Sequence, residues 1–367
     1  THIDKHAFGR CSFLTSVVIP DSVINIGEGA FEGCIFLKSI IIPNSVTSIG
    51  QSIFKGCRSL VSITIPNSIK SIGKEMFADC SSLDSVTISD GVKHIEELAF
   101  RNCRSLASIA FPNSLNSIKS KAFSGCTSLT SVTIPNSVEN IDIYVFDSCK
   151  SLTSIEVEYG NTRYDSRENC NAIILTSIDG LIAGCVNTHI PNNISIIGAG
   201  AFSGCSFLTS INIPDNVFEI AEGAFRNCSS LASITLPNDL TDIAKNTFYG
   251  CSSLTTIIIP NRVTTIEEEA FSKCSSLHSI TIPDSVTSMT SWISGENAFS
   301  SCPNLKELVV SSSNPNYKSV NSLLLTKDGQ TLVAGINGNV TIPDSVTSIG
   351  DSAFGGYSGL TSVTIGN

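Results

Sequence analysis

The sequence is poor in charged side chains and in tryptophan. Charged residues make up 15% of the 367 residues and there is a single tryptophan, whereas ordinary globular domains carry about 25% charge. Acidic residues outnumber lysine and arginine by 32 to 22, so the net charge is −10. Nucleic-acid binding depends on clustered cations, and we therefore expect no nucleic-acid partner. No apolar run reaches the roughly 18 residues that a membrane span requires, so we expect no membrane span in this segment.

Patterns that mark catalytic and metal sites are missing as well. The five histidines fall at unrelated positions, without the H-E-x-x-H spacing of a zinc site. The glycines lie in turns, and neither a G-x-S-x-G elbow nor a phosphate-binding G-x-G-x-x-G occurs. We predict no catalytic residues, no cofactor and no metal ion, and hence a protein that is not an enzyme.

What the sequence does contain is a repeat of 23 residues. Phenylalanine recurs at this step through most of the chain, and a cysteine follows three residues after each of these phenylalanines except the last. Residues 126–148, CTSLTSVTIPNSVENIDIYVFDS, show one unit. The recurring phenylalanines are Phe8, Phe31, Phe54, Phe77, Phe100, Phe123, Phe146, Phe202, Phe225, Phe248, Phe271, Phe299 and Phe354.

The order of residues within a unit predicts its shape. Leu129, Val132 and Ile134 are separated by polar residues, which indicates a short strand with one buried face. Pro135 ends the strand because it has no N–H to donate, and the residues up to Phe146 return the chain over the core. Such a unit is too short to bury its own apolar residues, so it must stack on its neighbours. We therefore predict a solenoid with parallel strands about 4.8 Å apart.

Residues 37–57, LKSIIIPNSVTSIGQSIFKGC, closely resemble the BspA-type leucine-rich repeat, also called the Treponema pallidum-type repeat. The resemblance covers nearly the whole chain and implies a leucine-rich-repeat solenoid with a parallel β-sheet on its concave face. It also implies a cell-surface or secreted protein, because the family's proteins are typically found there and adhere to host proteins or other cells where a role is known. The repeat is already under way at Thr1, so we expect the chain to be a piece of a longer protein.

Two long breaks interrupt the repeat, and both contain the same kind of segment. In each, two apolar runs flank an Asp-Gly pair, Asp179-Gly180 or Asp328-Gly329, which is a strong hairpin signal. We predict a single solenoid over residues 1–367 with two inserted β-hairpin modules that project from it. Its parts are regular rungs over 1–158, a hairpin insert over 159–190, regular rungs over 191–311 with a bulge near 290–294, a second hairpin insert over 312–338 and a terminal rung over 339–367.

The cysteines lack the spacing of a metal site. Twelve of the fourteen recur at one position of the unit, so they stack in a column whose side chains point parallel, and we expect them to be reduced and buried. Cys170 and Cys185 lie outside the column, and both simple burial and a disulfide between them stay open. Glycosylation stays open at three sequons, Asn193, Asn227 and Asn339.

Acidic residues recur just before the Ala-Phe pair, interrupted by Lys74 and Lys245. The spacing of oxygen ligands in a calcium loop is absent, so we expect a solvated edge rather than a cation site. The acidic residues are Glu28, Glu97, Glu222, Glu268, Glu296 and Asp351.

The outward face of the strands is the expected binding surface, since leucine-rich repeats usually bind partners there. It is mostly threonine, serine and alanine, with little charge and no aromatics. The bulge carries the only tryptophan, which is either a contact residue or folded back over the edge of the solenoid. The candidate binding residues are Lys38, Val61, Asp84, His278, Lys306 and Trp292.

These patterns predict a monomeric, non-enzymatic interaction or adhesion module. Its expected partners are extracellular-matrix or cell-surface proteins, with glycans as a further class, and a repetitive face suits broad, multivalent contacts. The alternative function is a structural spacer or stalk that displays another domain.

Overall fold

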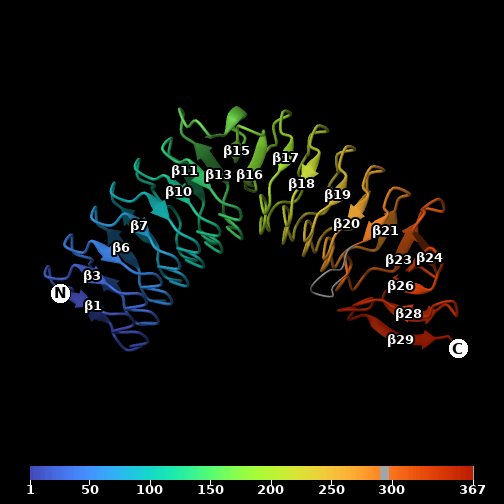
Figure 1. Ribbon diagram of the computed structural model, residues 1–367, viewed down its shortest axis with the longest axis horizontal. Coiled ribbons are helices and arrows are strands. Elements are labelled where there is room, and N and C mark those ends of the chain that lie inside the picture. Colours follow the sequence, from blue (N-terminus) through green and yellow to red (C-terminus); the bar gives the residue numbers. More distant parts are fainter. Residues whose placement is uncertain (290–296, 367) are drawn as a thin grey trace. The chain divides into compact units, whose positions relative to one another are not determined.

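The computed structural model describes residues 1–289 and 297–366. It divides into two compact units, one of residues 1–177 and 182–188, the other of residues 178–181 and 189–367. Within each unit, consecutive rungs of the chain lie side by side (Figure 1). The single continuous stack and its boundaries stay predictions, and Trp292 with the bulge near residues 290–294 lies outside the described residues.

In the first unit, the Leu-x-x-Ile-x-Ile segment of a rung forms a strand of two to four residues, which we call the long strand of the rung. Each residue of such a strand lies opposite the residue 23 positions later, as Ser62 lies opposite Ser85. This one-rung register is the one that the repeat predicts. The parallel pairs are β2 (Ser16–Val17) with β4 (Ser39–Ile40), β6 (Ser62–Ile65) with β8 (Ser85–Ile88), and β11 (Ser131–Ile134) with β13 (Ser154–Val157).

A second strand of two residues lies in the returning half of the rung, where the sequence indicated no strand. The isoleucine of this strand points into the core. The backbone around it donates hydrogen bonds to the preceding rung, as the Gly50 N–H does to the Ile26 oxygen at 2.9 Å. The backbone polar groups of the returning segment are thereby satisfied. One sheet holds β1 (His2–Ile3), β3 (Asn25–Ile26) and β5 (Ser48–Ile49), and another holds β7 (Ser71–Ile72), β9 (His94–Ile95), β10 (Ser117–Ile118) and β12 (Asn140–Ile141).

The second unit keeps the short strands but fewer of the long ones. Its long strands are β21 (Ser279–Ile282), β23 (Glu307–Val310), β27 (Gly338–Ile342) and β29 (Leu360–Ile365), with one isolated bridge between Ile258 and Thr281. Earlier rungs still stack there, since the Ala232 N–H donates to the Thr209 oxygen at 3.2 Å. The short strands are β17 (Ile196–Ile197), β18 (Glu219–Ile220), β19 (Asp242–Ile243), β20 (Thr265–Ile266) and β22 (Ser288–Met289).

The recurring phenylalanines form a stack of rings in the core of each unit. Phe8 to Phe146 stack with ring centroids 5.2–5.8 Å apart. Phe202 to Phe299 stack at 5.2–5.9 Å in the second unit. The rings are nearly parallel because one rung repeats the backbone of the last, and most of them have no exposed surface. This confirms the predicted stacking for these twelve phenylalanines, whereas the Phe354 ring contacts Tyr357.

The column cysteines lie beside these rings. The Cys57 thiol donates to the Phe31 oxygen at 3.2 Å, and the same bond recurs from rung to rung, as from Cys80 to Phe54 at 3.0 Å. All fourteen cysteines are free, and the column members are buried except Cys11, which is exposed, and Cys205, which is half-buried. The prediction of reduced, buried thiols is thus confirmed for most of the column.

Both breaks in the repeat hold antiparallel strands. In the first, β14 (Tyr164–Asp165) pairs with β15 (Ala172–Leu175), and a short 3-10 helix (Arg167–Asn169) lies between them. In the second, β25 (Leu323–Thr326) pairs with β24 (Tyr317–Val320) on one side and with β26 (Thr331–Ala334) on the other. The turn at Asp328-Gly329 joins β25 to β26.

The expectation that these modules project from the solenoid is wrong. Leu323, Leu324 and Leu325 are all fully buried, as are Ala172 and Ile173. The reason is that a continuous apolar run can be covered on both faces, whereas a projecting hairpin would leave one face in water.

The last strand of a module acts as the short strand of a rung. β26 pairs in parallel with β28 (Ser348–Ile349), and the Gly335 N–H donates to the Ala353 oxygen at 2.8 Å. Other rungs make that bond from a phenylalanine, as Phe271 does to the Ala298 oxygen. Gly335 therefore takes the phenylalanine position. A Cβ there would lie 2.1 Å from the Phe354 ring, so only glycine fits without a shift.

Candidate functional site

Five of the six candidate binding residues lie just before the long strands, at the same position of successive rungs. We call such a row of residues a ladder. In the first unit, the Val61 N–H donates to the Lys38 oxygen at 3.2 Å and the Asp84 N–H to the Val61 oxygen at 3.0 Å. In the second unit, the Lys306 N–H donates to the His278 oxygen at 2.9 Å. All five side chains are exposed. The structure therefore brings together Lys38, Val61 and Asp84, and separately His278 and Lys306, while Trp292 lies outside the described residues.

The outward face of β4, β6 and β8 is hollowed beside the first of these ladders. A shallow groove of about 880 Å³ runs over the three strands. Ile41, Thr64 and Thr87 line it along the strands, and Pro43 and Pro66 lie where the strands end. We call this surface the strand groove. Its lining mixes hydroxyl and amide side chains with isoleucines and prolines, and Ile41 is the exposed isoleucine among them, which suits contact with a mixed protein surface rather than capture of a small molecule.

Large apolar side chains are exposed on the first two rungs. Val18 is 92% exposed and Ile41 80% exposed, and each directly follows the end of one of two paired strands, since Val17 pairs with Ile40. Phe13 and Phe36 stack on each other with centroids 6.1 Å apart, and Phe13 is 86% exposed. Exposed apolar clusters mark interaction surfaces.

Sequence analysis missed Phe13, Phe36 and their counterpart Phe207 in the second unit. Each occupies the position two residues after the column cysteine, where most other rungs have serine. An aromatic residue in place of a recurring serine was the available signal. The outward strand positions themselves carry no aromatic residue.

A second hollow of about 550 Å³ lies at the start of the first module. Tyr159 is fully exposed beside it, and Glu156 and Arg167 also line it. Arg167 is bound to Asp165 by an ion pair of 2.8 Å. Two of the charged groups that line this hollow, Asp165 and Arg167, are thus engaged with each other.

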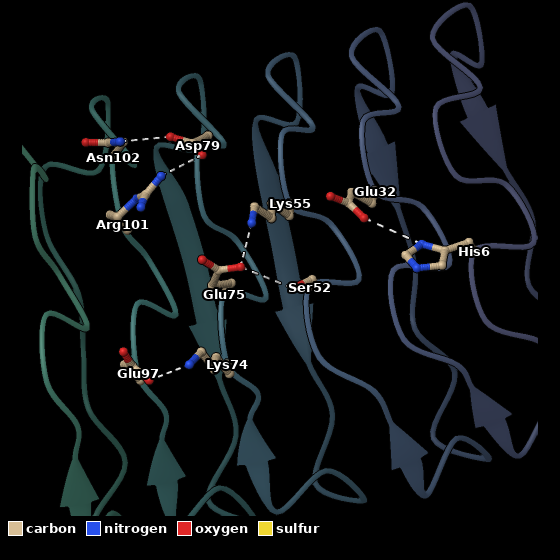
Figure 2. A network of polar contacts seen from close by, with 10 residues as sticks. All are labelled: His6, Glu32, Ser52, Lys55, Lys74, Glu75, Asp79, Glu97, Arg101 and Asn102. Atoms are coloured by element: carbon tan, nitrogen blue, oxygen red, sulfur yellow. Dashed lines mark hydrogen bonds and ion pairs between the residues drawn. The ribbon is translucent and has the colours of Figure 1, made fainter.

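Ion pairs join neighbouring rungs at the turns (Figure 2). Lys74 pairs with Glu97 at 2.6 Å, and Lys55 pairs with Glu75 at 2.5 Å. The hydrogen bond to Glu97 raises the pKa of Lys74. The lysines that interrupt the acidic row are therefore paired with the next acidic residue along it.

The expected solvated acidic edge needs one correction. Glu268 is 4% exposed and accepts a hydrogen bond from the Lys245 ammonium at 2.7 Å. The reason is that a charge can be buried in this row when the preceding rung supplies a cation. Glu296 lies outside the described residues.

The thiols are poorly suited to nucleophilic chemistry. Burial raises the pKa of Cys57 and of Cys126 to about 12, so both stay protonated at neutral pH, and the thiolate is the reactive form. Cys170 and Cys185 are both free and buried. The Cys185 thiol donates to the Asn171 oxygen at 3.4 Å, and the alternative of a disulfide between the two is wrong in this structure.

Among residues 1–289 and 297–366, no three histidine, cysteine or acidic side chains come together in a way that could hold a metal ion. The same residues include no helix long and apolar enough to cross a membrane.

The comparisons with known proteins decide the family. The model of the BspA type leucine rich repeat region matches residues 1–103, 83–180, 183–306 and 336–367. The chain belongs to the BspA-type leucine-rich repeat family. No curated protein matches it in sequence.

Solved structures of similar proteins carry the same solenoid. A leucine rich cell surface protein from Faecalibacterium prausnitzii A2-165 is 30% identical, with a TM-score of 0.65 over 85% of this chain and 83% of the other. A leucine-rich repeat protein from Eubacterium ventriosum is 21% identical, with a TM-score of 0.61 over 86% and 83%. The pneumococcal vaccine antigen PcpA is 20% identical, with a TM-score of 0.59 over 100% and 85%. The last two likenesses show the fold alone.

Proposed function

We propose that this BspA-type chain is a non-enzymatic module of a cell-surface or secreted protein, and that it binds extracellular protein partners through the strand groove and the ladder beside it. The observation that carries the proposal is the exposed apolar pair of Val18 and Ile41, which lies beside the start of the ladder that holds Lys38 and Asp84. A similar protein from Faecalibacterium prausnitzii is a cell surface protein, which supports the location.

The arrangement of the groove supports a protein partner. Apolar side chains at the centre of an interface supply affinity, while charges at its rim set orientation and specificity. Here the apolar pair lies at the ends of β2 and β4, and the two charges of opposite sign lie in the neighbouring ladder. A partner with an apolar ridge and complementary rim charges would fit this surface.

Binding to immobilised extracellular-matrix proteins tests the proposal. Replacing Val18 and Ile41 by serine should weaken binding by about tenfold or more, since central interface residues contribute about 1 kcal/mol or more each. Lys38→Ser with Asp84→Ser should weaken it less and slow association. Each pair leaves the net charge unchanged.

The matched control is Lys93→Ser with Glu139→Ser, which removes one cation and one anion from exposed positions outside the groove. It should bind like the unmodified protein. Equal binding by all variants would contradict the proposed surface. A chain that retains none of the proteins above background would instead support the role of a structural spacer.

A further inference from the structure

Three cations project from the turn that follows the column cysteines. Arg58, Arg104 and Lys150 each come directly after a column cysteine and are exposed. None of the three side chains makes a hydrogen bond or an ion pair with any part of the chain that the structure describes. In contrast, Lys55 and Lys74 of the same unit are paired with acidic residues (Figure 2). We call the three residues the cation column.

The first two members of the cation column border a hollow of about 270 Å³, together with Asp79, Ser81 and Asn102. The Asp79 carboxylate does not compete for the two arginines, because it accepts from the Asn102 amide at 2.8 Å and pairs with Arg101 at 3.3 Å. Figure 2 shows Arg101 and Asn102 both directed toward Asp79. The hollow therefore offers two unpaired guanidinium groups beside a neutralised carboxylate.

The spacing of the cation column is regular. Its members are 46 residues apart, which is two rungs, with Ser81 and Thr127 at the same position in the rungs between. The turns are held in register, since the Ser82 N–H donates to the Arg58 oxygen at 3.2 Å and the Ser105 hydroxyl to the Ser81 oxygen at 2.8 Å. At the spacing of neighbouring strands, two rungs correspond to about 10 Å. The column thus presents one cation about every 10 Å, with a hydroxyl side chain between each pair.

We propose that the cation column binds a linear acidic polysaccharide in which acidic sugars alternate with neutral ones. Each guanidinium can hold a carboxylate or sulfate with two parallel hydrogen bonds. The Ser81 hydroxyl can donate to and accept from sugar hydroxyls, and the Thr127 hydroxyl, which donates to the Arg104 oxygen at 3.4 Å, can accept from one. Several weak contacts along one polymer add up to useful affinity. None of these residues lines the strand groove, so the inference does not depend on the proposed protein partner.

Other polyanions fit the column less well. Nucleic acid carries a phosphate about every 3.4 Å along each strand, so most of its charges would have no cation opposite. An extended acidic peptide would need an acidic side chain at every third residue, because its rise is about 3.3 Å per residue. An alternating polysaccharide needs no such coincidence.

The test uses the full chain and hyaluronan oligosaccharides, in which a carboxylate-bearing sugar alternates with a neutral one. Binding is measured by calorimetry at low and at physiological salt. Hyaluronan should bind and neutral dextran should not. Arg58→Ser with Arg104→Ser should weaken binding by about tenfold or more, because each lost charge-assisted contact is worth more than a neutral hydrogen bond. Serine already fills this turn position at Ser12 and Ser81, and unchanged thermal melting would show that the variant is folded.

Two further variants separate spacing from charge. Lys70→Ser with Lys93→Ser removes the same charge from exposed positions outside the column and should bind like the unmodified chain. Ser81→Arg with Arg104→Ser keeps the charge but puts the arginines on adjacent rungs, and it should weaken binding. Equal hyaluronan binding by all four proteins, or tighter binding of single-stranded DNA or poly-glutamate than of hyaluronan, would overturn the proposal.

Discussion

The phenol oxygen of Tyr164 accepts a hydrogen bond from the backbone N–H of Ile141 at 2.9 Å. Ile141 belongs to β12, the last strand of its sheet, so no neighbouring strand supplies an acceptor there. Tyr317 plays the same part for Met289, in the last strand of another sheet, at 3.0 Å. Each module thus begins by supplying a side-chain acceptor to an open strand edge.

Two more residues of each module repeat this arrangement. The Asn161 amide donates to the oxygens of Pro135 and Val138, each at 3.0 Å, and Asn314 does the same for Pro283 and Val286 at 2.8 and 2.9 Å. The Ser166 and Ser319 hydroxyls accept from the N–H groups of Val157 and Val310. The shared motif N-x-x-Y-x-S therefore closes the preceding rung.

Tyr164→Phe should open the end of this rung. The change leaves the partly buried Ile141 N–H without its acceptor, which costs about 1 kcal/mol. Amide hydrogen exchange should show faster exchange at Ile141, and Tyr159→Phe, at a fully exposed ring, should leave it unchanged. Unaltered protection of Ile141 in Tyr164→Phe would contradict the role of the phenol.

Gly335→Ala should destabilise the last rungs by about 1–3 kcal/mol, as overpacking of a full core does. The added methyl group meets the Phe354 ring. Chemical denaturation of Gly335→Ala, Phe354→Ala and the double variant measures the coupling between the two positions. The double variant should lose less than the sum of the single losses, and simple additivity would show that the methyl group does not meet this ring.

Phe123→Ala should cost about 3–5 kcal/mol, because it opens a cavity in a packed ring stack. Its ring touches those of both Phe100 and Phe146, so hydrogen exchange should speed up across residues 100–149 before the rest of the chain melts. Phe13→Ala removes an exposed ring and should change stability little. Unchanged exchange in those rungs would place Phe123 outside the shared core.

The buried thiols should make stability fall at alkaline pH. Burial raises the pKa of Cys126 to about 12, while an unfolded thiol titrates near 8.5. Below the pKa of the thiol in the unfolded chain, the thiol is protonated in both states, and its contribution to the free energy of unfolding is fully present. Above it the unfolded chain releases a proton that the folded chain keeps, so this thiol lowers the free energy of unfolding by about 1.4 kcal/mol per pH unit.

Denaturant melts between pH 8 and 10.5 measure this slope. Cys126→Ala should make it shallower by the amount that one thiol contributes. Cys11→Ala, at an exposed position, is the control and should leave the slope unchanged. A slope that Cys126→Ala does not alter would show that Cys126 is not desolvated.

Thiol titration without reductant gives a separate check. After denaturation all fourteen cysteines should react, since all are free. In the folded protein Cys11 should react first, because only exposed thiols are accessible. Clearly fewer than fourteen reactive thiols after denaturation would mean that the column is cross-linked.

The repeat predicted those parts of the fold that every rung shares. The phenylalanine and cysteine columns follow from a fixed 23-residue step, because residues at one phase must stack when rungs are identical. The strand register follows for the same reason. The burial of the modules could not be predicted from the repeat. An apolar run such as Leu323–Leu325 has the same sequence whether one or both faces of its strand are covered.

Other features depend on contacts that a single unit does not display. A two-residue strand such as Asn25–Ile26 is too short to show an alternating pattern. The role of Gly335 becomes visible only beside the Phe354 ring, and the unpaired state of Arg58 only once its neighbours are placed. Of the candidate site, the exposed ladder positions could be predicted, whereas the groove and the stacked pair of Phe13 and Phe36 could not.

The cysteine-to-phenylalanine bond has a consequence for how such a gene can change length. Cys57 bonds to Phe31 and Cys80 to Phe54, so each donor finds its acceptor in the rung before it. Loss or gain of one whole unit by recombination between repeats would give every thiol a new but equivalent carbonyl. A change of another length need not break the bond, because the rung before Cys302 is five residues longer than the others and the Cys302 thiol still donates to the Phe271 oxygen at 3.1 Å. Natural variants of this chain should therefore differ mainly by complete units, with extra residues added within a rung where the bond can re-form.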